Sequence, residues 1–180
     1  MSILSDEEIR ELVHITPFHG GGYKSGVISS GLTSYGYDLR LGRRFKLLNP
    51  EWNGVIDPKL IDPKAFIDYT VDELVIPGYG FALGESLEYL EVPRNVLCIC
   101  LGKSTYARCG IIVNVTPLEP EWRGRVTIEI SNTTPRPAKL YAGEGIVQVV
   151  FLRADRPCSI SYADKKGKYQ DQKGIELPQV

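Results

Sequence analysis

Short runs of apolar or alternating residues, separated by turns that contain glycine or proline, follow one another along most of the chain. Such runs predict strands, and many of them in succession are typical of a sandwich, a jelly roll or a barrel. We therefore predict a mainly β fold. The predicted strands are Tyr35–Leu41, Arg44–Leu48, Leu74–Ile76, Gly80–Leu83, Val96–Leu101, Ile111–Val115, Arg125–Ser131, Ala138–Tyr141, Gly145–Leu152 and Cys158–Tyr162.

One helix is predicted near the start of the chain. Ser5 and Glu8 have the spacing of a capping box, in which each side chain accepts a hydrogen bond from the other residue's backbone N–H. Leu4 and Ile9 stand where a hydrophobic staple would place them. The pattern predicts a short helix from Asp6 to Val13, followed by a glycine-rich loop.

No repeat or linker divides the sequence, so residues 1–180 are predicted to form a single domain.

The end of the chain has a different composition. Asp164–Gly174 is polar and rich in lysine, glycine and glutamine, and such a segment cannot bury enough apolar surface to order itself. Residues 164–180 are therefore either a frayed terminus or a flap that orders over an anionic ligand.

Residues 125–131 alternate between two faces of the predicted strand. One face is apolar; the other carries Thr127, Glu129 and Ser131. A glutamate in the middle of a strand is disfavoured by strand preference. Glu129 is either a solvent-facing side chain or a pocket carboxylate with a raised pKa, which would suit a general base.

Gly102–Gly110 follows a strongly apolar strand and is predicted to form one or two helical turns. Ser104 and Arg108 would then share a face, and Lys103 would lie beside the free N–H groups of the first turn. Two interpretations stay open: an anion cradle, or a plain connection with surface charges. The segment is not a P-loop, because GxxxxGK[ST] is absent.

Charge and composition exclude several function classes. The net charge is −1, which argues against duplex nucleic acid or an anionic membrane as a partner. No apolar run approaches the roughly 20 residues that span a bilayer. The acidic start lacks the layout of a signal peptide, so we expect a cytoplasmic protein. The two histidines, His14 and His19, are far in sequence from every cysteine, so no zinc site is predicted.

Five motifs, in their order and spacing, closely resemble the bacterial dCTP deaminase family of the dUTPase-like superfamily. They are Ser34–Arg40, Gly102–Gly110, Asn114–Trp122, Thr127–Asn132 and the tail Lys168–Gly174. The likeness runs from Ile3 to Pro178. One departure is the loop before Trp122, which is shorter than in the enterobacterial form and has Pro117 where that form has a small residue.

The resemblance implies a distorted jelly-roll or β-barrel subunit and a homotrimer with shared active sites. It implies deamination of dCTP to dUTP and ammonia without zinc, on the route to dUMP and dTTP, with Mg²⁺ on the triphosphate and dTTP as feedback inhibitor. The implied catalytic residues are Glu129 as general base, with Ser104 and Arg108. The implied nucleotide contacts are Lys103, Ser104, Thr105, Tyr106, Ala107, Arg108, Glu119, Thr127, Ile128, Glu129, Gln148, Tyr162, Lys168 and Gln172.

Zinc nucleobase deaminases carry H-x-E and P-C-x-x-C motifs, which this sequence lacks. Glu129 would therefore activate water itself. Desolvation would raise its pKa, and the Arg108 charge would lower it. Two alternatives remain. One is a dUTPase or a bifunctional enzyme, although Glu119 stands where those enzymes use an aspartate. The other is a catalytically inactive nucleotide-binding regulator, against which the presence of Glu129, Ser104 and Arg108 argues.

Overall fold

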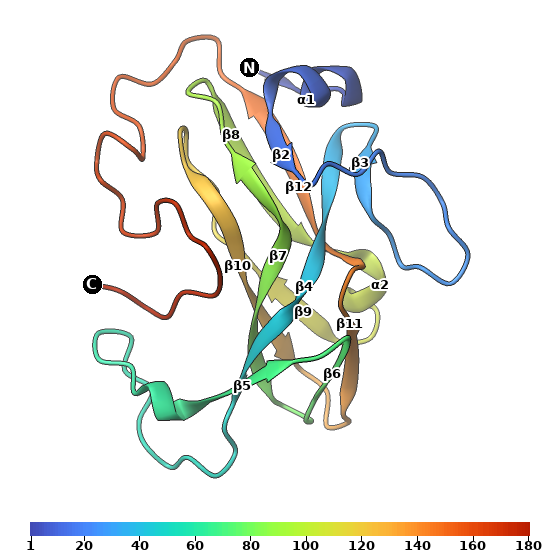
Figure 1. Cartoon of the computed structure of the whole chain (residues 1–180), viewed down its shortest axis with the longest axis vertical. Helices are drawn as coiled ribbons and strands as arrows, with labels where there is room; N and C mark the ends of the chain where they lie inside the picture. The colour runs from blue at the N-terminus through green and yellow to red at the C-terminus, as the bar shows by residue number, and fades with distance from the viewer.

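The computed structural model describes residues 1–180. A curled sheet of 10 strands forms most of the molecule, and two further strands form a separate small sheet (Figure 1). The strands are β1 (Ser2–Ile3), β2 (His14–Thr16), β3 (Gly31–Thr33), β4 (Gly36–Leu48), β5 (Phe66–Thr70), β6 (Glu73–Ile76), β7 (Phe81–Glu91), β8 (Val96–Gly102), β9 (Ile111–Asn114), β10 (Arg123–Asn132), β11 (Ala138–Tyr141) and β12 (Gly145–Arg153). The helices are α1 (Asp6–Leu12), α2 (Ser104–Ala107) and a 3-10 turn at Pro63–Ala65.

Strand β4 joins the two halves of the large sheet. Its first residues pair with β12, with Asp38 opposite Gln148, and its later residues pair with β7 and β5. The sequence predicted two strands here, but the structure has one strand of 13 residues. A register shift between Leu41 and Phe45 lets this long strand bend from one half to the other without ending.

The core lies within the curl of the sheet and is built from the inward positions of alternating strands. Tyr37, Phe45 and Phe151 are the largest fully buried side chains. Burial of these apolar positions removes the inward faces of β4, β10 and β12 from water, which is the main stabilising contribution in such a fold. The predicted mainly β architecture is confirmed.

The predicted helix is confirmed with its capping box. The Ser5 hydroxyl accepts a hydrogen bond from the Glu8 N–H, and the Glu8 carboxylate accepts one from the Ser5 N–H at 3.0 Å. The helix ends at Leu12, one residue earlier than predicted, because Val13 is already extended. No helix in the structure is both long enough and apolar enough to cross a membrane.

Some strand predictions were incomplete or wrong. β7 runs on to Glu91, well beyond the predicted Gly80–Leu83, and β1, β2, β3 and β5 were not predicted. Cys158–Tyr162, predicted as a strand, forms none. Instead, the carbonyl oxygens of Cys158 and Ser159 accept hydrogen bonds from the Arg94 guanidinium, so the backbone there is satisfied without a neighbouring strand.

Candidate active site

Strand β10 presents Glu129 on the face opposite the core. The predicted alternation is confirmed: Val126, Ile128 and Ile130 are buried, whereas Thr127 and Glu129 are half-buried on the other face. Pairing with β7 sets this orientation and places Glu129 opposite Leu83. The Ile128 side chain, expected to contact a nucleotide, lies in the core, so only its backbone is available to a ligand.

The Glu129 carboxylate lacks the hydrogen bonds that usually stabilise a buried charge, and its pKa is raised. Its Oε2 atom is buried and has no hydrogen-bond partner. Burial raises the pKa of Glu129 to about 7, and a hydrogen bond with its own backbone opposes this rise only in part. The expected lowering of this pKa by Arg108 is not found within one chain. Glu129 can therefore exchange a proton near neutral pH.

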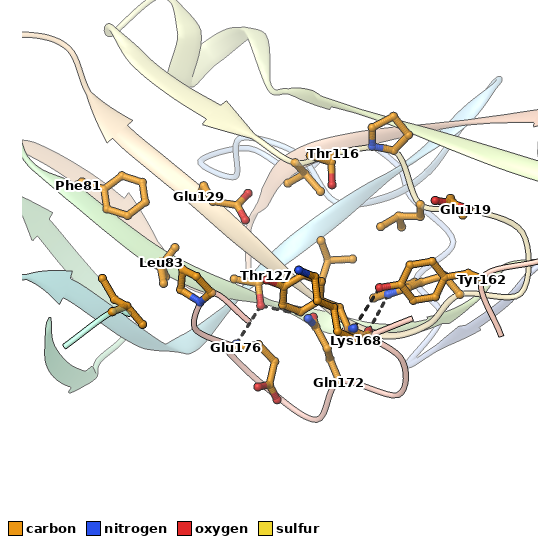
Figure 2. A pocket seen from close by; sticks show the side chains of 18 of the residues that line it. Phe81, Leu83, Thr116, Glu119, Thr127, Glu129, Tyr162, Lys168, Gln172 and Glu176 are labelled. Carbon is orange, nitrogen blue, oxygen red and sulfur yellow. Dashed lines mark hydrogen bonds between the residues drawn. The ribbon is translucent and has the colours of Figure 1, made fainter. Parts of the chain in front are cut away.

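A cavity of about 640 Å³ surrounds Glu129, a volume within the usual range for small-molecule sites. Its two ends differ in character. Phe81 and Leu83 lie on one side of Glu129, while Glu119, Tyr162 and Lys168 lie toward the other (Figure 2). The lining also includes the apolar Ile56, Ile61 and Phe66 and the polar Thr127, Gln172 and Glu176.

The C-terminal tail forms one wall of this cavity. It runs beside β10 (Figure 1), where Gln172 forms a parallel bridge with Gly124 and its carbonyl accepts a hydrogen bond from the Arg125 N–H at 2.9 Å. Gly124 has φ +149°, and a Cβ there would lie 2.8 Å from the Gln172 nitrogen. Only glycine therefore fits at this approach. The tail therefore packs closely against the strand that carries Glu129.

Tyr162 and the polar residues of the tail are hydrogen-bonded within the chain itself. The Tyr162 hydroxyl accepts a hydrogen bond from the Tyr169 N–H at 3.0 Å, and Lys168 Nζ donates to the Gln179 carbonyl at 2.5 Å. Lys165 Nζ forms a 2.8 Å ion pair with Glu119. A nucleotide that used these groups would compete with exposed contacts, which are individually weak.

Helix α2 forms the turn that the sequence predicted, and the Arg108 N–H donates to the Ser104 carbonyl at 3.0 Å. Ser104, Thr105, Ala107 and Arg108 are exposed, and none of them lines the Glu129 cavity. The Tyr106 side chain is buried, and its hydroxyl accepts a hydrogen bond from the Tyr141 N–H at 3.2 Å. Its side chain is therefore part of the core and not of the exposed surface.

Lys103 and Gln148 lie together outside the cavity, beside Asp38. Lys103 Nζ donates to Asp38 Oδ2 at 2.6 Å, and Gln148 stands opposite Asp38 in the register of β12 with β4. The expected nucleotide contacts thus fall into two places in one chain. Glu119, Thr127, Glu129, Tyr162, Lys168 and Gln172 line the cavity, whereas Lys103 and the exposed residues of α2 do not.

Phe81, Trp122 and Tyr169 are among the cavity residues that were not predicted as site residues from the sequence. Trp122 carried a signal, since it closes a proline-restricted loop directly before the strand of Glu129. Tyr169 carried a weaker one, since it lies in the tail motif Lys168–Gly174. Phe81 carried none, because nothing local distinguishes it from an ordinary core aromatic.

No group of three or more His, Cys, Asp and Glu side chains is arranged to hold a metal ion. All four cysteines are free. Burial raises the pKa of Cys100, which lies near Glu129, to about 12, so its thiol stays protonated at neutral pH.

Residues 3–154 match the dCTP deaminase-like family. The chain belongs to this family. It is 57% identical over 184 residues to the dCTP deaminase of Chloroflexus aggregans, covering 100% of this chain and 99% of that relative. It is 57% identical over 183 residues to the dCTP deaminase of Acidobacterium capsulatum and 54% identical over 189 residues to that of Methylacidiphilum infernorum, in each case covering 100% of both chains.

Solved structures place this member of the dCTP deaminase family among dUTPase-like folds. The 2'-deoxycytidine 5'-triphosphate deaminase of Agrobacterium tumefaciens superposes with a TM-score of 0.61 at 17% identity, over 83% of this chain and 47% of that one. The dUTPase of Staphylococcus bacteriophage 80alpha superposes with a TM-score of 0.51 at 10% identity, over 82% of this chain and 94% of that one. At these identities the likeness is one of fold.

Proposed function

We propose that the protein deaminates dCTP hydrolytically, giving dUTP and ammonia, and that it does so without zinc. The observation that carries the proposal is the half-buried Glu129 inside a cavity of nucleotide size: its Oε2 atom is buried without a hydrogen-bond partner, and its pKa is about 7. The names of the similar dCTP deaminases support the choice of substrate.

The reaction needs one group that both accepts and returns protons. Glu129 takes a proton from a water molecule while the water oxygen forms a bond to C4 of cytosine. The proton passes to N3. The tetrahedral carbon then loses its amino group as ammonia, because the C4–N4 bond breaks while the proton of the newly bound hydroxyl passes to N4, leaving the C4=O group of uracil. Positioned acid–base catalysis of this kind contributes roughly 10²–10⁴-fold in rate. Ser104 and Arg108 stabilise the charge that develops on the ring.

The polar end of the cavity suits the charged part of a nucleotide. Lys168 and Gln172 can donate hydrogen bonds to phosphate oxygens, which are strong when one partner is charged. Mg²⁺ would arrive on the triphosphate, because the protein supplies no group of acidic side chains to hold it. We propose that the protein acts in the cytoplasm, on the route to dUMP and dTTP. We also propose that dTTP competes for the same cavity as a feedback inhibitor.

We also propose that the protein works as a homotrimer in which α2 of one subunit completes the cavity of the next. Two features support this arrangement. Ser104 of α2 and Arg108 directly after it are exposed and do not line the cavity of their own chain. Leu101 and Ile112, on the strands on either side of α2, are 54% and 56% exposed, which is typical of a surface covered by a partner.

The decisive experiment is product analysis of the wild-type protein and of Glu129→Gln with dCTP and Mg²⁺. We expect dUTP and ammonia from the wild type and a loss of at least about 10²-fold in kcat for the variant, with dCTP binding retained. Glu73→Gln, which alters an exposed strand glutamate paired with Lys139, is the control and should be fully active.

Other products would select another function. Release of dUMP and pyrophosphate would indicate dUTPase or bifunctional activity, and tight dCTP binding without ammonia would indicate a regulator. A Glu129→Gln variant with more than about a tenth of wild-type kcat would contradict Glu129 as the base.

Shared sites can be tested by mixing two inactive variants. Glu129→Gln and Arg108→Gln subunits, unfolded and refolded together in equal amounts, should regain about a quarter of wild-type activity if each site combines Glu129 and Arg108 from different subunits of a closed ring. Each variant refolded alone should stay inactive. No recovery in a mixture that is shown to contain mixed trimers would contradict shared sites.

A further inference from the structure

Asp38 is a buried carboxylate within the motif Ser34–Arg40. It lies on β4 between Gly31 of β3 and Gln148 of β12 and is only 2% exposed. Lys103, in the connection between β8 and α2, extends its side chain across β12 to reach it, and the Nζ–Oδ2 distance is 2.6 Å. The pair therefore joins the middle of one strand to the residue directly before α2.

The Asp38 carboxylate has no side-chain partner other than Lys103. A buried carboxylate is strongly disfavoured unless it is paired and hydrogen-bonded. Lys103 supplies the only side-chain hydrogen bond to Asp38, and Asp38 Oδ1 is buried with no partner at all. Release of Lys103 would leave the carboxylate without any compensation, so Lys103 is kept in this position.

Lys103 nevertheless keeps part of its binding capacity. An ammonium group has three N–H donors, and Nζ donates a hydrogen bond to Asp38 alone. Its side chain is 19% exposed, whereas that of Asp38 is 3% exposed. The Lys103 backbone is fixed as well, because its N–H donates to the Ile146 carbonyl at 2.9 Å. Donors remain for a ligand while the side chain is already immobilised.

We propose that Asp38 is a positioning residue for nucleotide binding: it holds the Lys103 ammonium beside α2, oriented for a phosphate, before the ligand arrives. The inference rests on the proposed function, in which α2 of one subunit, with Lys103 directly before it, completes the nucleotide site of the next. A side chain that is ordered in advance loses less conformational freedom on binding, so Asp38 lowers the Kd for the phosphates without touching them. Its effect belongs to binding and not to the chemical step.

The test is a double-mutant cycle with Asp38→Asn, Lys103→Met and the double variant. Asp38→Asn should raise KM for dCTP about tenfold and change kcat by less than about threefold, since it removes ground-state positioning alone. In the Lys103→Met background the same substitution should leave KM unchanged. Asp68→Asn is the matched control, because Asp68 pairs with Lys46 at 2.7 Å on a strand edge away from α2.

Binding of inorganic tripolyphosphate with Mg²⁺, followed by calorimetry, gives a readout that needs no turnover. Asp38→Asn should weaken it about tenfold relative to wild type, in parallel with KM. If the wild type bound tripolyphosphate but released no ammonia from dCTP, the proposed function would fail while this test stood.

Three outcomes would overturn the role of Asp38. One is an unchanged KM in Asp38→Asn. Another is a fall in kcat without a rise in KM. The third is a further rise in KM in the Lys103→Met background, which would show that Asp38 acts independently of Lys103. If Asp38→Asn alone does not fold, the double variant, which contains neither charge, is compared with Lys103→Met and decides the question in the same way.

Discussion

The indole Nε1 of Trp122 donates a 2.9 Å hydrogen bond to the carbonyl oxygen of Tyr169. Both residues line the cavity of Glu129. Trp122 directly precedes β10, the strand that carries Glu129, and Tyr169 belongs to the tail. One hydrogen bond thus links the tail to the strand that carries Glu129. Because this bond is partly buried, its loss should have a measurable cost in free energy.

Replacing Trp122 by Phe keeps an aromatic ring and removes this donor. Loss of one such hydrogen bond costs about 1 kcal/mol, so the tail should open about fivefold more often. Amides of residues 168–172 should exchange with deuterium correspondingly faster, and KM for dCTP should rise by a similar factor. Trp52→Phe is the control, because Trp52 Nε1 bonds Asp62 outside the cavity. Equal exchange rates in the wild type and Trp122→Phe would show that the tail is held by other contacts.

Gly124→Ala should displace the tail without altering the core. A methyl group at this position would meet the Gln172 nitrogen at 2.8 Å and would also impose a backbone conformation that L-residues disfavour. Gly143→Ala shares the positive φ but has nothing within 4 Å, so it separates strain from contact. We expect Gly124→Ala to raise KM by about tenfold or more and Gly143→Ala to leave it unchanged, while both lose about 1 kcal/mol of stability. Equal KM values would disprove docking at Gly124.

The pH dependence of kcat/KM should report the pKa of Glu129 in the free enzyme. A general base must be ionised, and this pKa is about 7. The rate should therefore fall about tenfold for each pH unit well below 7 and level off above it. Initial rates from pH 5 to 9 in buffers of constant ionic strength would measure this. A profile that levelled off already at pH 5 would mean that Glu129 has an ordinary pKa.

The pH dependence of stability should also report Glu129, but folding favours its protonated form, whereas catalysis needs its ionised form. Glu129 has a folded pKa of about 7 against 4.5 for a solvent-exposed glutamate, so between these pH values the folded chain keeps a proton that the unfolded chain releases. The stability that this proton provides is complete below about pH 4.5 and is lost as the pH rises toward 7. Glu129→Gln, which is neutral at every pH, should match the wild type in Tm near pH 4.5 and exceed it at pH 8. Each kcal/mol corresponds to about 2–4 °C in Tm. A Tm difference that did not change with pH would contradict this.

The sequence predicted elements whose stabilising contacts are local. The capping box of α1 joins residues three positions apart, and the alternation of β10 is visible in seven consecutive letters. β7 was predicted only in part because Glu85, Ser86 and Glu88 are buried within it. Glu88 is tolerated there because Arg40, 48 residues away, bonds it at 2.6 Å. No local pattern in the sequence indicates such a long-range partner.

The candidate site was likewise predictable only where its signal in the sequence is local. Glu129 is conspicuous because a strand glutamate is unusual, and the tail is conspicuous by composition. The inward orientation of Tyr106 was hidden, since it depends on a hydrogen bond from Tyr141, 35 residues away. Cys158–Tyr162 was wrongly predicted as a strand because it is a short alternating run, although Ile160 within it is 62% exposed.

The unequal ends of the cavity impose a direction on whatever enters it. A phosphate placed near Lys168 stays hydrated or paired, whereas the same phosphate turned toward Phe81 and Leu83 would lose its water and find no donor. A reversed ligand is thus rejected by desolvation and not by shape. Uncharged nucleosides lack this distinction, so they should enter in either orientation and bind as a mixture of poses, of which only one brings the base to Glu129.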